Sequence, residues 1–92
     1  MAQVVITLKI MPTSPEVDLS SIIDEVSRMI IEFAGETDIK TEEEPIAFGL
    51  KALIVMFVSD EAKGATEDLE AEISGIEGVQ SIEVTDVRRA IG

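Results

Sequence analysis

The sequence predicts an α+β sandwich in which two helices cover one face of a four-stranded antiparallel sheet. Apolar residues alternate with a period of two along several segments, which is typical of strands. In two other segments they recur at helical spacing, which is typical of amphipathic helices. Because 92 residues have room for only one core, these elements are expected to form a single domain.

The first strand and the first helix are clear in the pattern. Residues 3–11 alternate between apolar and polar positions, and the prolines that follow end this strand. Its apolar face carries Val4, Ile6, Leu8 and Ile10. Asp18 is placed to cap a helix over residues 19–33, whose apolar stripe stops near Gly35.

The middle of the chain combines a polar segment with the most apolar strand. Residues 36–45 can form a short polar strand and a loop, and the structure of residues 37–44 stays open. Residues 50–58 are apolar on both faces, which is typical of a central strand. If the helices leave one sheet face uncovered, we expect a patch available to a partner. The side chains expected in that patch are Leu53, Val55 and Phe57.

The last third of the chain predicts a second helix and a fourth strand. Thr66 can cap this helix, and the acidic residues of its first turn suit the positive end of the helix dipole. Its buried stripe is expected at Leu69, Ile73 and Ile76. Residues 79–87 alternate again, with Ile82 and Val84 inward. The order β-α-β-β-α-β with right-handed crossovers gives a ferredoxin-like sandwich.

The composition excludes several kinds of chemistry. The chain has no Cys and no His, which removes disulfides, thiolate metal sites and catalysis by thiol or imidazole groups. Its 19 Asp and Glu residues against 7 Lys and Arg give a net charge of −12, which disfavours direct binding of nucleic acid. We see no signal peptide and no membrane-spanning segment, and we expect a cytoplasmic protein.

Two candidate sites for enzymatic or metal chemistry are weak. Residues 11–18 lack the glycines and the cation of a phosphate cradle, which disfavours an acylphosphatase-like enzyme. The consecutive carboxylates Glu42, Glu43 and Glu44 alternate in direction on an extended chain and converge poorly on a metal ion. We therefore expect no catalytic residue, no metal site and no cofactor.

Phe48 and the pair Arg88–Arg89 are the two features with candidate functions. Phe48 lies in a Pro-Ile-Ala-Phe-Gly segment before the most apolar strand. It is either an aromatic cap of the core or a projecting anchor for a partner. Arg88 and Arg89 are adjacent cations near the end of an acidic chain. They either pair with nearby acids or present a basic tip to an anionic or metal site of a partner.

Residues 45–53, Pro-Ile-Ala-Phe-Gly-Leu-Lys-Ala-Leu, resemble a motif of the elongation factor 1-beta family, and of its archaeal members in particular. A second likeness lies in residues 75–89, and the resemblance covers essentially the whole chain. It implies a single guanine nucleotide exchange domain, residues 1–92, that acts by binding and is not an enzyme. It also implies a GTPase partner, elongation factor 1-alpha, which releases GDP, takes up GTP and carries aminoacyl-tRNA to the ribosome.

The same resemblance implies roles for individual residues. A loop phenylalanine that packs on the partner in the eukaryotic relative corresponds to Phe48, with Gly49 and Lys51 beside it in the motif. A lysine of the relative that reaches the magnesium and phosphate region corresponds to Arg89. Because arginine replaces lysine there, Arg88 can share or take that role. The alternative on the same fold is an ACT-like module for small-molecule sensing or oligomerisation; otherwise we expect a monomer.

Overall fold

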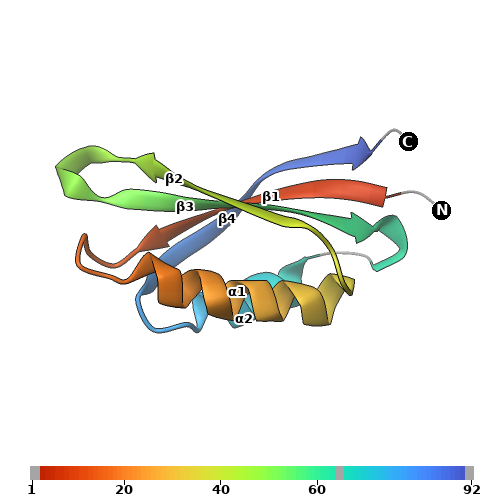
Figure 1. The fold of residues 1–92 in the computed structure, drawn as a ribbon, viewed down its shortest axis with the longest axis horizontal. Helices are drawn as coiled ribbons and strands as arrows, with labels where there is room; N and C mark the ends of the chain where they lie inside the picture. Colours follow the sequence, from red (N-terminus) through yellow and green to blue (C-terminus); the bar gives the residue numbers. More distant parts are fainter. Residues whose placement is uncertain (1–2, 64–65, 91–92) are drawn as a thin grey trace.

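The computed structural model describes residues 3–63 and 66–90 and has two helices packed against one face of a sheet (Figure 1). The strands are β1 (Gln3–Pro12), β2 (Ile39–Pro45), β3 (Lys51–Asp60) and β4 (Val79–Ala90). The helices are α1 (Leu19–Ala34) and α2 (Glu67–Ser74), with 3-10 turns at Ala47–Gly49 and Glu61–Lys63. The sheet order is β2-β3-β1-β4 with antiparallel neighbours. This confirms the predicted ferredoxin-like α+β sandwich.

Helix α1 begins and ends close to its predicted limits. The Asp18 carboxylate accepts a hydrogen bond of 3.0 Å from the backbone N–H of Ser20, which caps the first turn. Gly35 ends the helix with φ 83°, a conformation that glycine adopts without steric strain. The face of α1 toward the sheet buries Ile22, Val26 and Ile30. No helix in the described part of the chain is long and apolar enough to span a membrane.

Helix α2 is short, and its cap differs in detail from the prediction. Thr66 occupies the N-cap position, but its hydroxyl donates to the Glu70 carboxylate at 2.8 Å and makes no cap bond to the helix backbone. Two residues of the predicted stripe, Leu69 and Ile73, are buried on α2. Ile76 is also buried, but it lies beyond the end of the helix.

The core between the sheet and the helices overturns the expected patch on β3. Leu53, Val55 and Phe57 are at most 1% exposed and belong to the core under the helices, so the prediction that they face a partner is wrong. The other face of β3 carries Ala52, Ile54, Met56 and Val58. Because this strand is apolar on both sides, its sequence does not indicate which side meets the helices. The side is set by pairing with β1, which buries Ile6, Leu8 and Ile10.

Strands β2 and β4 are both more regular than the sequence indicated. Residues 39–45 form the exposed edge strand β2, in the segment whose structure the sequence left open. Strand β4 continues beyond residue 87, so Arg88 and Arg89 are part of the sheet and not of a free tail. The inward positions Ile82 and Val84 pack against the core as predicted.

A β-bulge at Thr85 changes the direction of the last residues of β4. Asp86 lies opposite Thr7, whereas Val84 lies opposite Leu8, which leaves Thr85 without a counterpart on β1. Before the bulge the even-numbered residues of β4 face the helices, and after it the odd-numbered residues do. Arg89 therefore lies on the helix side of the sheet and Arg88 on the open side.

Two neighbouring substitutions test this assignment of faces. Phe57→Ala is expected to lower the free energy of unfolding by about 3–5 kcal/mol, because it removes a fully buried ring. Met56→Ala, on the open face, is expected to lower it by about 1 kcal/mol or less. Urea denaturation followed by circular dichroism measures both changes. If Phe57→Ala does not fold, Phe57→Leu gives the smaller core loss; equal losses at the two positions would contradict the assignment.

Candidate functional site

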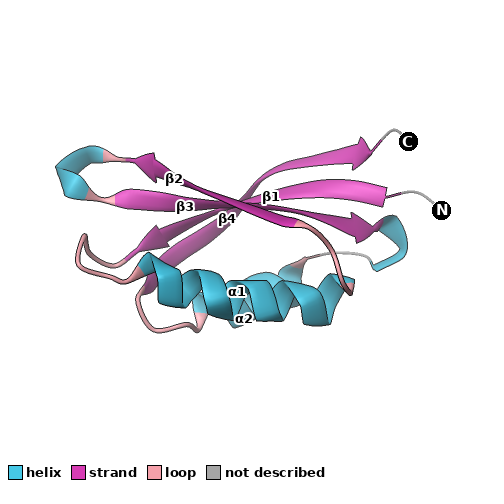
Figure 2. Ribbon diagram, viewed as in Figure 1, coloured by secondary structure: helices cyan, strands magenta, loops and turns pink. Residues whose placement is uncertain are grey.

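The connection between β2 and β3 places Phe48 in solvent at one end of the molecule. The two strands extend beyond the helices there and are joined by the 3-10 turn Ala47–Gly49 (Figure 2). The backbone N–H of Ile46 donates to the carbonyl of Leu50 at 2.7 Å and closes the hairpin. Phe48 is 95% exposed, so it is not a cap of the core. Aromatic side chains are enriched among the residues that dominate protein–protein contacts, which makes Phe48 a candidate contact residue.

The backbone of the Phe48 turn is strained. Phe48 has φ 63° and ψ 29°, and Gly49 follows with φ 78°. A left-handed conformation costs a residue with a bulky side chain roughly 1–2 kcal/mol, and among the described residues Phe48 is the one non-glycine with positive φ. Strain of this kind is found at functional sites, where the surrounding structure maintains it. The exposure of Phe48 and the strain of its backbone therefore both mark it as a candidate functional residue.

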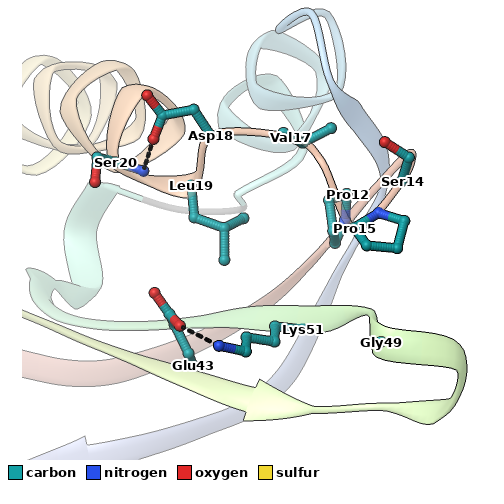
Figure 3. A pocket seen from close by; sticks show the side chains of 10 residues that line it. All are labelled: Pro12, Ser14, Pro15, Val17, Asp18, Leu19, Ser20, Glu43, Gly49 and Lys51. Atoms are coloured by element: carbon teal, nitrogen blue, oxygen red, sulfur yellow. Dashed lines mark hydrogen bonds and ion pairs between the residues drawn. The ribbon is translucent and has the colours of Figure 1, made fainter.

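A shallow cavity of about 270 Å³ beside the turn includes two more of the predicted residues (Figure 3). Gly49 and Lys51 line it together with Glu43 and residues of the β1–α1 loop. A Cβ placed on Gly49 would lie 3.9 Å from Cγ of Pro15, so this loop lies directly against the turn. Lys51 Nζ is 3.6 Å from Glu43 Oε1. The structure thus brings Phe48, Gly49 and Lys51 together at one end of the sheet.

Arg88 and Arg89 both pair with acids, as one of the two interpretations of the sequence expected. On the open face, Arg88 Nε lies 2.7 Å from Asp86 Oδ2. On the helix side, Arg89 donates two hydrogen bonds to Glu61, from Nε to Oε2 at 3.1 Å and from Nη2 to Oε1 at 2.9 Å. The hydrogen bonds and the charge of Glu61 raise the pKa of Arg89. The arginine side chains stay 79% and 71% exposed and can still meet a partner.

The Phe48 turn and the two arginines occupy opposite ends of an elongated molecule. Its extents are 42 × 22 × 19 Å, and the β2–β3 turn lies far from the end of β4 (Figure 1). Ile10 pairs with Leu53 near the turn, and Val4 pairs with Arg89. At about 3.3 Å per residue, these two levels of β1 are roughly 20 Å apart. A partner must therefore span roughly 20 Å or more to contact both ends at once.

The three consecutive glutamates of β2 diverge. Glu43 approaches Lys51 on the helix side, whereas Glu44 Oε2 lies 3.9 Å from Lys9 Nζ on the open side. In residues 3–63 and 66–90, no three or more acidic side chains are grouped in a way that could hold a metal ion.

Glu61 and Asp86 are neighbours of the arginines that the sequence analysis did not single out. Asp86 and Arg88 are two positions apart on one strand, a spacing that places both side chains on the same face. The pairing of Asp86 with Arg88 could therefore have been predicted from the alternating pattern of this strand. Glu61 is 28 residues from Arg89 and becomes its neighbour only through the pairing of β1 with both β3 and β4.

Comparisons with known proteins agree on one family. A family model described as "EF-1 guanine nucleotide exchange domain" matches residues 5–90. "Elongation factor 1-beta" of Methanothermobacter thermautotrophicus is 55% identical over 89 residues, which cover 97% of this chain and 98% of the relative. "Elongation factor 1-beta" of Sulfolobus acidocaldarius is 40% identical over 87 residues, 94% of each chain. These matches do not favour the ACT-like alternative.

Comparisons with solved structures concern the fold alone. The de novo designed protein Foldit4 has a TM-score of 0.65 and 18% identity, with 98% of each chain covered. A putative antibiotic biosynthesis monooxygenase from Bacillus cereus has a TM-score of 0.54 and 16% identity, with 100% of this chain and 96% of the other covered. Unrelated functions share this sandwich, so neither likeness bears on function.

Substitutions in the turn measure how much its left-handed backbone costs in stability. Phe48→Asn is expected to leave the free energy of unfolding unchanged or to raise it by up to about 1 kcal/mol, because asparagine tolerates the left-handed region. Gly49→Ala is expected to lower it by about 1 kcal/mol, because φ 78° strains an alanine. Urea denaturation measures both. A clear loss of stability in Phe48→Asn would mean that the ring supports the fold.

Proposed function

Because the chain belongs to the EF-1 guanine nucleotide exchange family and so has a role in guanine nucleotide exchange during translation elongation, we propose that its partner is the GTPase elongation factor 1-alpha. In this proposal the chain accelerates release of GDP, GTP enters, and the GTPase again carries aminoacyl-tRNA to the ribosome. The observation that carries the proposal is Phe48, an almost fully exposed aromatic side chain on a strained turn. Aromatic residues are enriched among those that contribute most to binding at protein interfaces, which supports this role for Phe48.

The proposed activity depends on differential binding and on no covalent chemistry. The chain must bind the nucleotide-free GTPase more tightly than the GDP-bound GTPase, since a ligand shifts an equilibrium only by its difference in affinity for the two states. By reciprocity, GDP must weaken the binding of the chain by the same factor. The proposal therefore includes no catalytic residue, metal or cofactor of the chain itself.

The two ends of the molecule have different proposed roles. At one end, Phe48 supplies the apolar contact, Gly49 permits the turn, and Lys51 adds a polar contact beside it. At the other end, Arg89 brings a cation to the magnesium and phosphate region of the GTPase. A cation there is repelled by the metal ion and competes with it for oxygen atoms, which weakens the hold on GDP. Arg88 is the second candidate, but it points to the opposite face of β4, so one GTPase surface meets one arginine at a time.

The acidic surface supports the choice of a protein partner. A net charge of −12 repels the phosphates of nucleic acids and attracts a basic protein surface, mainly by raising the association rate. We propose that residues 1–92 act as one monomeric exchange domain in the cytoplasm, without direct contact to nucleic acid or membrane.

Release of fluorescent GDP from elongation factor 1-alpha tests the proposal and the anchoring role of Phe48. The wild-type chain is expected to accelerate release in a concentration-dependent way. Phe48→Ala is expected to raise the concentration needed for half-maximal acceleration by about tenfold or more, because the ring is the proposed interface anchor. Ile31→Ala, which removes another exposed apolar side chain from α1, serves as the matched control.

Two results would count against these assignments. If the wild-type chain leaves the release rate unchanged, the proposed function is wrong. If Phe48→Ala and Ile31→Ala both behave like the wild type, exchange remains but the anchor lies elsewhere.

A matched pair of variants distinguishes the two arginines. Arg89→Gln is expected to lower the maximal release rate by about tenfold or more, because it removes the proposed cation while keeping a side chain of similar length. Arg88→Gln is expected to leave that rate within about twofold of the wild type. The same release assay at saturating concentrations of each variant makes the comparison. The reverse order would assign the role to Arg88.

A further inference from the structure

We propose that Glu61 is a positioning residue for nucleotide exchange, because its carboxylate fixes the direction in which the Arg89 guanidinium leaves the sheet. The inference rests on the proposed function of the chain and adds a residue to it. Glu61 does not touch the nucleotide in this proposal; it acts through Arg89.

Glu61 binds one edge of the guanidinium and leaves another edge accessible. The bonds from Nε and Nη2, at 3.1 and 2.9 Å, form a side-on fork with the two carboxylate oxygens. Further N–H groups of the guanidinium, on Nη1 and Nη2, are directed away from a carboxylate held in this way. They can donate to a phosphate oxygen while the ion pair with Glu61 stays intact. The pair therefore orients the cation without consuming its capacity to bind an anion.

The position of Glu61 is itself fixed by the fold. Glu61 begins the 3-10 turn that directly follows β3, and the Asp60 carboxylate accepts a hydrogen bond of 2.8 Å from the backbone N–H of Ala62 in that turn. Ser59 of β3 and Arg89 of β4 lie opposite the same residue of β1, Val4. Glu61 and Arg89 thus meet across the end of β1. Their pair joins the turn after β3 to the edge strand β4.

The bulge at Thr85 determines which arginine meets Glu61. Without the extra residue, strand alternation would turn Arg88 toward the helix side and Arg89 toward the open side. The Thr85 hydroxyl donates to the carbonyl of Thr7 at 3.4 Å beside the bulge. The local structure of β4 therefore directs Arg89, and not its neighbour, to the carboxylate.

Among the residues that the structure describes, Arg88 has no equivalent support. Its ion pair with Asp86 joins two positions of one strand and links no second element of the fold. Both pairs are largely exposed, and exposed pairs contribute little to folding stability because water and salt screen them. Stability therefore does not account for the fork at Arg89, whereas orientation of a working cation does.

GDP release from elongation factor 1-alpha, with the full chain, tests this role. Glu61→Gln keeps the size of the side chain and removes its charge, and it is expected to lower the maximal release rate about tenfold, in line with the loss of other orienting residues. The concentration for half-maximal acceleration should change little, because the Phe48 anchor is intact. Asp86→Asn, which removes the acid that pairs with Arg88, is the matched control and should match the wild type. In an Arg89→Gln background, Glu61→Gln should have no further effect.

Urea denaturation of Glu61→Gln separates positioning of Arg89 from simple support of the fold. Because the pair is exposed, the urea midpoint of this variant should match that of the wild type while its maximal release rate falls. A wild-type maximal rate in Glu61→Gln, an equal loss in Asp86→Asn, or a lower urea midpoint that accompanies the slower release would each overturn the inference. Failure of the wild-type chain itself to accelerate release would instead overturn the proposed function.

Discussion

The side chains of Ile6, Leu8 and Ile10 leave one face of β1 and are buried under the helices. Because β1 pairs with β3 on one side and with β4 on the other, this row determines which face of each neighbour meets the core. On β3 it selects Leu53, Val55 and Phe57. A slip of one residue in either pairing would exchange the buried and exposed side chains along the whole neighbouring strand. The apolar side chains of that strand would then face solvent. The directions of the candidate functional side chains follow from the same pairing.

The edge of the sheet explains the acidic run without a ligand. Strand β2 is exposed along nearly its whole length and pairs only with β3 in the sheet. Such an edge offers unpaired backbone groups to other chains, and charged side chains or proline disfavour that pairing. Strand β2 has both features: the charged side chains of Glu42, Glu43 and Glu44, and then Pro45. The acidic run is therefore accounted for by solubility and by protection of the edge.

The parts of the structure that could be predicted from sequence are those in which only one face is apolar. The alternation of β1 and the apolar stripe of α1 each allow only one choice of buried face, and the structure has that face buried. The predicted Asp18 cap of α1 is also present. β3 is apolar on both faces, so its orientation depends on a neighbour. The bulge at Thr85 has no glycine or proline to mark it, and it decides where Arg88 and Arg89 point.

The candidate site was predicted in its residues but not in its geometry. Phe48 could be named from the motif, yet an aromatic residue in a short apolar turn fits a core cap and a surface anchor equally well. Its exposure in the structure excludes the core cap. The contact between Glu61 and Arg89 depends on the register of three strands, which composition and local periodicity do not contain.

Strand β3 connects the two ends of the proposed mechanism. It follows the Phe48 turn directly and leads directly into the turn that begins with Glu61. A ten-residue strand spans roughly 30 Å, and in the interior of a sheet it cannot change length without breaking hydrogen bonds to both neighbours. Docking of Phe48 on the partner would therefore fix where Glu61 and Arg89 stand relative to the bound nucleotide. A guanidinium delivered at a fixed distance acts at a high effective concentration, so contact energy from one end can favour GDP release at the other. A flexible peptide with the same residues would lack that spacing, which gives the rigid sheet a function of its own.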